Sequence, residues 1–271
     1  MKKYLYLFTI IIIFGFCNIS YANTVEEIKM DVYIENDGSA EIIEIWEYTS
    51  DDNTEIYHAY KNLGNSQIRD LEVWRDGKKY ETIDNWDIDE SFEYKKNRCG
   101  IYRNGDSTEI CWGIGEYGTH TYKVKYVIDN FVKQLEDSQL IYWELVSVND
   151  EKRKDVKITI RSAEYFEDTT EVWGFGNYGG LAYVYDGCVE MEADNGLKSD
   201  EYMTILVKLP IDMFNARDNI DKNFEHYLKM AQKGSETYKG DIMDTYIMPA
   251  IFGFTILSIT VASFLARPSK G

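Results

Sequence analysis

The chain has 271 residues, with 47 acidic against 29 basic side chains and a formal net charge of −18. Four of the basic residues lie in the two terminal segments described below, so residues 23–246 hold 25 basic and 47 acidic side chains. A surface this acidic repels phosphate backbones, which argues against a nucleic-acid partner. No Cys/His cluster has the spacing of zinc ligands.

The N-terminus has the three parts of a secretory signal. Lys2 and Lys3 precede the apolar run Leu5–Phe16, and Ser20–Ala22 supplies small residues at a cleavage site. The sequence therefore predicts that residues 1–22 are a signal peptide. An uncleaved anchor helix is the alternative, but the apolar run is shorter than the ~20 residues that a span needs.

An uncharged apolar run, residues 247–266, lies near the C-terminus. At ~1.5 Å per residue it is just long enough for the ~30 Å hydrocarbon core of a bilayer. Arg267 and Lys270 follow it, and this bias of positive charge predicts a cytoplasmic tail, residues 267–271. We therefore expect a single-pass protein of the cell membrane with residues 23–246 outside.

The segment between the termini has the pattern of antiparallel strands. Apolar residues alternate with polar ones over residues 119–128, 155–160 and 203–209. Five dipeptides favour hairpin turns, because both of their residue types accept a positive φ; they are Asp37-Gly38, Asp76-Gly77, Asn104-Gly105, Asp186-Gly187 and Asn195-Gly196. The fold class predicted is an all-β ectodomain.

The exterior is large for one sandwich and comfortable for two. We divide it near Asn130, into a first β-sandwich-like domain over residues 23–130 and a second over residues 131–214. One continuous β unit is the alternative.

The periodicity becomes helical after residue 214. Apolar residues recur at helical spacing at Ile220, Phe224, Leu228 and Ala231. Asp218 is placed to cap such a helix and Gly234 to end it. Residues 215–246 are therefore predicted to hold a juxtamembrane helix and a polar spacer.

Two segments share the pattern Trp-Gly-x-Gly-x-Tyr-Gly, at Trp112–Gly118 and Trp173–Gly179. They also match the dinucleotide fingerprint, but strands follow where that fingerprint needs a helix, so no cofactor is expected. Aromatic side chains on glycine-rich loops suit sugars or the apolar side chains of a partner. The candidate binding residues are Trp112, Tyr117, Trp173 and Tyr178. The alternative is that each Trp is a core residue that fills the end of a sandwich.

Four carboxylates within seven residues form a candidate calcium site, at Asp84, Asp87, Asp89 and Glu90. The segment lacks the glycine and the distal glutamate of an EF-hand loop. A solvated acidic loop is the alternative.

Three cysteines remain after cleavage of the signal. Cys99 and Cys111 flank Asn104-Gly105, and a three-residue loop would place them directly opposite each other, close enough for a disulfide. A two-residue loop would pair Cys99 with Ile110 instead and turn the thiols to opposite faces. Three reduced thiols are the competing expectation.

No catalytic residue is assigned from the sequence. His58, His120 and His226 belong to no HExxH motif and no GxSxG serine accompanies them. A carboxylate pair for glycoside hydrolysis would not show itself in the sequence, because its members can lie far apart.

The order of these features resembles a family of bacterial predicted membrane proteins, domain of unknown function 2207. The matching pieces are MDVYIENDGSAEIIEIWEY, HAYKNLGNSQIRDLEVWRDGK, IGEYGTHTYKVKYVIDNFVKQLEDSQLIYWELV and VWGFGNYGGLAYVYDG, over about Lys29 to Phe214. The resemblance implies a β-rich extracellular domain with a membrane anchor, and it implies no activity.

The function expected is a membrane-anchored interaction module that binds a protein or glycan at the cell surface. Two alternatives stay open. One is a hydrolase of an envelope polymer that uses unidentified carboxylates. The other is an accessory subunit whose span packs against another membrane protein.

Overall fold

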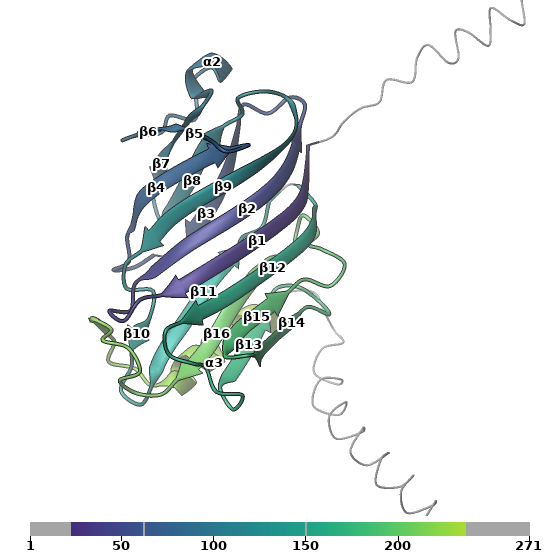
Figure 1. Cartoon of the computed structure of the whole chain (residues 1–271). Coiled ribbons are helices and arrows are strands. Elements are labelled where there is room, and N and C mark those ends of the chain that lie inside the picture. Colours follow the sequence, from purple (N-terminus) through teal and green to yellow (C-terminus); the bar gives the residue numbers. More distant parts are fainter. Residues whose placement is uncertain (1–22, 62, 150, 237–271) are drawn as a thin grey trace, which may run out of the picture. The chain divides into compact units, whose positions relative to one another are not determined.

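The computed structural model describes residues 23–61, 63–149 and 151–236, and these are mostly strand (Figure 1). The predicted signal peptide, residues 1–22, the predicted span, 247–266, and the tail, 267–271, lie outside the described residues. Within the described part, no helix has both the length and the apolar character needed to cross a membrane.

The strands, in chain order, are β1 (Thr24–Ile34), β2 (Ala40–Ser50), β3 (Glu55–Lys61), β4 (Ile68–Arg75), β5 (Lys78–Lys79), β6 (Glu81–Ile83), β7 (Arg98–Asn104), β8 (Ser107–Gly113), β9 (Gly118–Ile128), β10 (Lys133–Gln134), β11 (Gln139–Val146), β12 (Arg153–Ser162), β13 (Glu171–Phe175), β14 (Leu181–Tyr185), β15 (Cys188–Glu192), β16 (Met203–Leu209) and β17 (Asp218–Asn219). The helices in the described part of the chain are α2 (Phe92–Lys95) and α3 (Phe224–Glu236). The described residues up to Leu228 form one compact unit.

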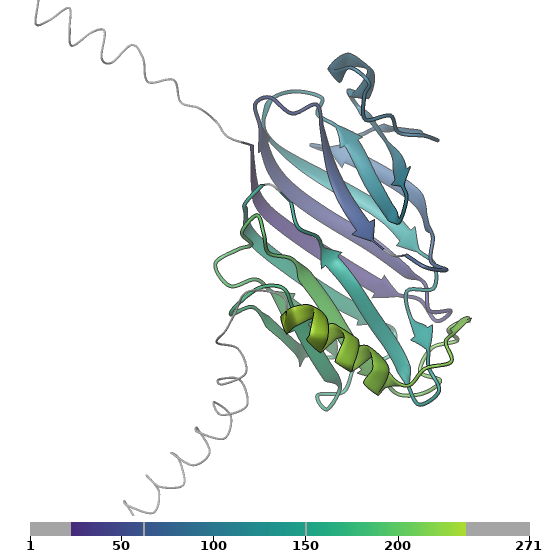
Figure 2. The same cartoon turned by 180° about the vertical axis from the view of Figure 1, so that it is seen from behind.

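The strands of the described residues form three sheets. The largest has the order β14-β15-β12-β1-β2-β9-β4-β5, and the other two have the orders β13-β16-β11-β10-β17 and β3-β8-β7-β6. The two smaller sheets lie behind the largest one (Figures 1 and 2). Because the inner faces are apolar, one core fills the space between the layers.

The predicted boundary near Asn130 does not separate two sheets. β1 pairs in parallel with β12, from Val25 opposite Arg153 to Ile34 opposite Ser162. Without β12, β1 would leave the backbone groups of one edge unpaired, which is costly inside a sheet. The described strands therefore form one β unit with a shared core rather than two sandwiches in tandem.

The alternating strands behave as predicted in β9 and β12, where every second residue is buried: Tyr122, Val124, Tyr126 and Ile128, and Val156, Ile158 and Ile160. β16 differs, because Thr204 and Leu206 on its other face are buried as well. The chain that follows β16 covers that face, and the ring of Phe224 lies 5.4 Å from that of Trp173 on the neighbouring strand.

Four of the five predicted turns join paired strands. In Asp76-Gly77 and Asp186-Gly187, both residues have the positive φ that a two-residue hairpin of type I′ needs. Asn195-Gly196 has positive φ values too, but the residue after it, Leu197, bridges to Arg153 rather than to a preceding strand.

The hairpin of β7 and β8 has a different register from the predicted one. Asn104 pairs with Ser107, so the loop consists of Gly105 and Asp106, and Cys99 lies opposite Trp112 while Cys111 lies opposite Gly100. Positive φ falls on Gly105, the first loop residue, as in a type II′ turn. The predicted disulfide is therefore wrong in this structure: the two buried thiols are free and point to opposite faces.

Helix α3 is present but begins later than predicted. Asn223 caps it, because its Oδ1 accepts a hydrogen bond from the backbone N–H of His226 at 3.1 Å. Asp218 lies in β17, where its carboxylate pairs with Lys133 Nζ at 2.7 Å. The helix continues through Gly234 to Glu236.

Candidate functional site

A hollow of ≈ 440 Å³ lies beside the hairpin of β4 and β5, and we name it the Tyr117 pocket. Its lining comes from the hairpin, from α2 and the residues after it, and from the segment after β8. The lining residues are Arg75, Lys78, Phe92, Lys96, Asn97, Gly115, Glu116 and Tyr117.

The β4–β5 hairpin and α2 hold two sides of the pocket. The tight Asp76-Gly77 turn sets Arg75 opposite Lys78 across the hairpin. On the other side, Ser91 caps α2 by accepting from the Tyr94 N–H at 3.3 Å. Lys95 anchors this short helix, because its buried ammonium donates to the Ile88 carbonyl and lies 3.3 Å from Glu55.

Two positions of the first Trp-Gly-x-Gly segment are glycine because atoms of neighbouring residues come close to their backbone. A Cβ on Gly113 would lie 2.0 Å from the carbonyl oxygen of Lys95. A Cβ on Gly115 would lie 2.3 Å from Arg75 Nη1 and 2.9 Å from Asn97 Oδ1. The glycines therefore let the backbone after β8 come close to α2 and to the guanidinium of Arg75.

Two aromatic rings form one wall of the pocket. The ring centroids of Phe92 and Tyr117 are 5.3 Å apart, with an angle of 36° between the planes. Tyr117 is 48% exposed, and Lys96 Nζ lies 5.9 Å from the centroid of Phe92. The wall offers apolar surface to a bound molecule while its edge stays in water.

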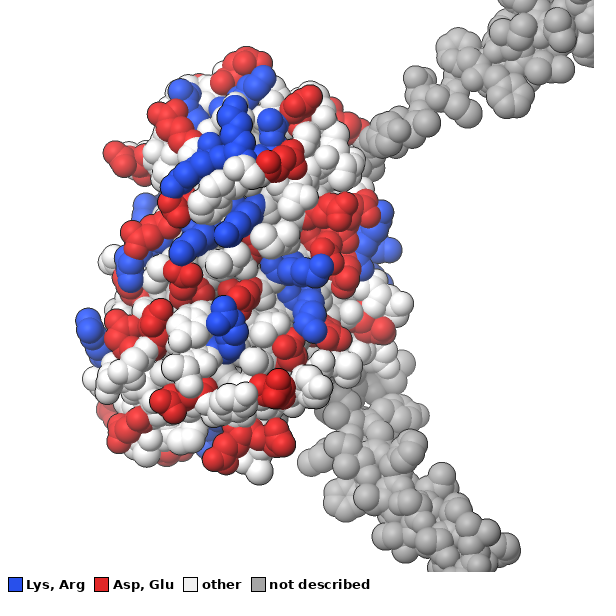
Figure 3. Space-filling view, in the orientation of Figure 1, with Lys and Arg blue, Asp and Glu red and all other residues white. Residues whose placement is uncertain are grey.

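The pocket is positively charged in an acidic chain. Within the described residues, none of the three lining cations, Arg75, Lys78 and Lys96, makes an ion pair with a carboxylate, whereas neighbouring Lys79 pairs with Glu72. The one carboxylate that lines the pocket is Glu116. Lys and Arg side chains gather on the surface around β4 and β5, while acidic side chains dominate the opposite end of this face (Figure 3).

Buried polar atoms without a hydrogen-bond partner concentrate around Arg75. Nine such side-chain atoms occur in the described residues, and three of them are Arg75 Nη1, Asn97 Oδ1 and His120 Nε2. The hydroxyl groups of Tyr80 and Tyr122 lie in the same cluster and interact with each other. Tyr122 lies opposite Arg75 in the sheet, and His120 binds Asp76 through Nδ1 at 2.6 Å. Since buried polar groups are ordinarily satisfied, these atoms around Arg75 keep a capacity to donate or accept that no side chain of the described residues uses.

The tyrosines in this cluster are donors at neutral pH. Burial raises the pKa of Tyr80 to about 12, and burial also raises the pKa of Tyr122. Both hydroxyls therefore stay protonated. Arg75 Nη1 also carries a proton that no acceptor receives, so the cluster around Arg75 is rich in donors.

Trp112 is not a surface residue. Its side chain is fully buried, its ring packs edge-on against Trp46 at 5.5 Å, and it also contacts Tyr122. The prediction that Trp112 meets a ligand is therefore wrong, and the alternative of a core residue holds. Of the two candidate binding residues in the first segment, Tyr117 is the one that lines the pocket.

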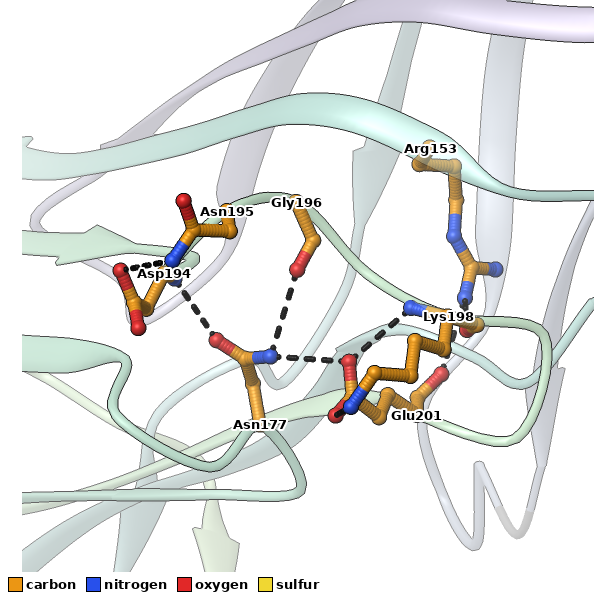
Figure 4. Close-up of polar contacts among 7 residues, drawn as sticks. All are labelled: Arg153, Asn177, Asp194, Asn195, Gly196, Lys198 and Glu201. Carbon is orange, nitrogen blue, oxygen red and sulfur yellow. Dashed lines mark hydrogen bonds and ion pairs between the residues drawn. The ribbon is translucent and has the colours of Figure 1, made fainter.

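The second aromatic segment is built differently. Trp173 is half-buried against Phe224, while Tyr178 is 56% exposed. Between them, Asn177 donates from Nδ2 to the Gly196 carbonyl and to Glu201, and accepts from the Asp194 N–H at 2.8 Å (Figure 4). These bonds tie the loop to the chain that follows β15.

Buried Arg153 completes this brace. Its guanidinium donates to the carbonyls of Lys198 and Glu201 at 3.0 and 2.9 Å (Figure 4). It also donates to the Ser147 carbonyl at 2.8 Å. Burial raises the pKa of the Glu201 carboxyl, but hydrogen bonds from Lys198 and Asn177 outweigh it and lower the pKa overall. Because the chain itself uses these groups, the second segment is a structural brace.

The predicted calcium site is not formed. Asp84, Asp87, Asp89 and Glu90 are all exposed, and Asp87 Oδ1 accepts from the Asp89 N–H at 2.9 Å. In the part of the chain that the structure describes, no group of three or more His, Cys, Asp or Glu side chains is arranged to hold a metal ion. The segment is a solvated acidic loop.

A buried acid and base, Glu44 and His58, are joined where sequence reasoning found only an isolated histidine. His58 Nδ1 lies 2.8 Å from Glu44 Oε1, and the same carboxylate accepts from Trp46 Nε1 at 2.6 Å and from the Tyr126 hydroxyl. Neither Glu44 nor His58 reaches the surface. The available signal was Glu44 itself, a charged residue at an inward position of an alternating strand.

Two solved enzyme structures that match this chain share little of its sequence. Yeast LTA4 hydrolase in complex with bestatin is 10% identical with a TM-score of 0.44, and the match covers 68% of this chain and 28% of that one. The M1 zinc metallopeptidase from Deinococcus radiodurans is 7% identical with a TM-score of 0.35, over 69% and 43% of the two chains. At such TM-scores the likeness supports no conclusion, and this chain spans less than half of either enzyme.

Sequence families are more informative. No curated protein matches the chain. The family model described as predicted membrane protein (DUF2207) N-terminal domain matches residues 24–209, which is more than half of the sequence and confirms the resemblance noted above. The chain therefore belongs to this family of predicted membrane proteins.

Proposed function

We propose that this chain is a binding module of the cell membrane and that the Tyr117 pocket takes an anionic ligand. The observation that carries the proposal is a set of three cations, Arg75, Lys78 and Lys96, that have no ion-pair partner among the described residues and line one hollow of a chain with net charge −18. A charged hollow with low-dielectric walls concentrates ligands of opposite sign. Its volume also falls within the range of ligand sites, ~300–1,000 Å³.

The proposed setting is the outer face of the membrane. The family is one of predicted membrane proteins, which supports a membrane location. The apolar run 247–266 and the basic residues after it support a single span with residues 23–246 outside. In this arrangement the pocket faces ligands outside the cell.

Binding fits the pocket better than hydrolysis does. Glycoside hydrolysis needs two carboxyl groups on either side of the scissile bond. Among the described residues, Glu116 is the one carboxylate in the lining. The pocket therefore suits the binding and orientation of a ligand. Its lining lacks the second carboxyl group that glycoside hydrolysis would need.

The test is a calorimetric titration of the full chain, purified in a neutral detergent at low salt, with three anionic probes: D-glucuronate, inorganic phosphate and N-acetyl-dialanine. We expect at least one to bind, and the double variant K78Q/K96Q to weaken that binding about tenfold. The matched control K154Q/K157Q removes the same charge from β12 and should leave affinity unchanged. Absence of binding by all three probes, or equal loss in both double variants, would refute the proposed function.

A further inference from the structure

We propose, resting on the function just given, that the ligand of the Tyr117 pocket is a sugar that bears one carboxylate, of the hexuronic-acid type. The pocket offers a donor side, an acceptor side and an apolar wall. Each constrains the ligand separately.

The hydrogen-bond donors of the pocket suit a ligand with an oxygen anion. Arg75 lines the pocket, and its Nη1 is a buried donor without an acceptor. The planar fork of a guanidinium matches a carboxylate or a phosphate with two parallel hydrogen bonds. Lys78 and Lys96 also line the pocket and add two further positive charges.

The acceptors of the pocket disfavour a ligand that has negative charge but few hydrogen-bond donors. Asn97 Oδ1 is a buried acceptor without a donor, and it lies against the same Gly115 position as Arg75 Nη1. Glu116, the carboxylate in the lining, accepts hydrogen bonds and repels anions. Phosphate at neutral pH offers few protons to these acceptors, whereas the hydroxyl groups of a sugar offer several. One ligand must therefore carry a negative group and hydroxyl donors together.

The apolar wall suits a ring. Phe92 and Tyr117 lie 5.3 Å apart, and Tyr117 is 48% exposed. Such a wall packs against the C–H face of a saturated ring while the hydroxyl groups at its edge reach polar partners.

A peptide fits this pocket less well. Extended peptides add to a sheet edge through a run of backbone hydrogen bonds. The edge strand beside the pocket, β5, has only two residues. Tyr80, directly after it, donates its backbone N–H to the Val73 carbonyl. A peptide could offer its terminal carboxylate here, but little of its backbone would be bound.

The experiment titrates the full chain in detergent with D-glucuronate, D-glucose, inorganic phosphate and N-acetyl-dialanine. We expect D-glucuronate to bind at least about tenfold more tightly than each of the other three. Binding of phosphate or the dipeptide as tightly as glucuronate would overturn the sugar assignment and leave the anionic pocket standing. Failure of all the anionic probes would instead refute the proposed function itself.

Two variants localise the sugar. Tyr117→Ala should weaken glucuronate binding about tenfold, whereas Tyr178→Ala, the matching residue of the second aromatic segment, should not change it. Arg75→Lys keeps the charge but removes the fork, so it should weaken glucuronate binding as well. Unchanged affinity in both Tyr117→Ala and Arg75→Lys, with unchanged melting temperatures, would place the sugar elsewhere and contradict the proposal.

Discussion

The hydroxyl groups of Tyr60 and Tyr126 lie 2.5 Å apart and share one hydrogen bond across the core. Tyr60 comes from β3 of the four-stranded sheet, and Tyr126 from β9 of the largest sheet. Because Tyr126 donates its own proton to Glu44, Tyr60 is the donor to Tyr126. The bond therefore extends the Glu44–His58 pair into a polar network that joins the two layers.

Loss of the Glu44 charge should destabilise the fold strongly. Glu44→Gln leaves a buried amide among donors arranged for a carboxylate, so we expect a loss of about 3 kcal/mol in the free energy of unfolding. Glu47→Gln on the same strand is the matched control, because Glu47 faces solvent; it should change stability by less than about 0.5 kcal/mol. Denaturant unfolding of the full chain in detergent measures both, and equal effects would contradict the network's role.

The Glu44 carboxyl should make the fold sensitive to acid. Burial raises its pKa, but the charge and hydrogen bond of His58, with bonds from Tyr126 and Trp46, outweigh burial and lower it below the ordinary 4.5. A lowered folded-state pKa contributes stability that is present above pH 4.5 and is lost as the pH falls through the folded value. The stability difference between the wild-type chain and Glu44→Gln should shrink below pH 4.5. A difference that stays constant down to pH 3 would contradict this.

Substitutions at Trp112 and Tyr117 should differ in effect: the first should lower stability, and the second should lower ligand affinity. Trp112→Ala removes a fully buried indole and should cost ~3–5 kcal/mol of unfolding free energy. Tyr117→Ala removes a half-exposed ring and should cost less than ~1 kcal/mol while it weakens ligand binding. Thermal melting and titration of the two variants check this, and a melting temperature for Trp112→Ala near that of the wild type would show that its indole is not a core residue.

Gly115→Ala should damage the pocket more than the fold. The new Cβ would lie 2.3 Å from Arg75 Nη1 and 2.9 Å from Asn97 Oδ1, so the ends of both side chains would have to move. The guanidinium would then leave its position, so we expect weaker anion binding with a nearly unchanged melting temperature. Anion affinity equal to that of the wild type would mean that the position of Arg75 does not matter.

Cys99 and Cys111 should remain unlinked. The observed register places them on opposite faces of the β7–β8 hairpin, and a bridge would require the strands to slip by one residue. Peptide mapping of the full chain under non-reducing conditions should find no peptide pair that contains both. A linked pair would show that the hairpin adopts the three-residue loop.

The sequence predicted local structure well where the preference of a turn dipeptide or the periodicity of a strand determines it. Asp76-Gly77 and the alternation of β9 follow from backbone preference and periodicity alone. The β7–β8 register was missed because Asn104-Gly105 allows positive φ at either of two loop positions, and periodicity does not choose between them.

Contacts between distant segments could not be predicted. Of the pocket, Tyr117 was identified through its aromatic loop, whereas Arg75 and Lys96 looked like two of 29 basic residues. They meet because α2 and the β4–β5 hairpin converge, which is a tertiary relationship. The parallel pairing of β1 with β12 was missed for the same reason.

That pairing has a consequence for the order in which the chain folds. β1 lies inside the largest sheet, yet its partner β12 is more than a hundred residues further along the chain. Closing so long a loop costs conformational entropy before any contact offsets it, which slows folding. If the chain is exported from its N-terminus, β1 emerges early and keeps one unpaired edge until residues 153–162 arrive. Throughout that interval the nascent chain exposes a surface to which another strand can add.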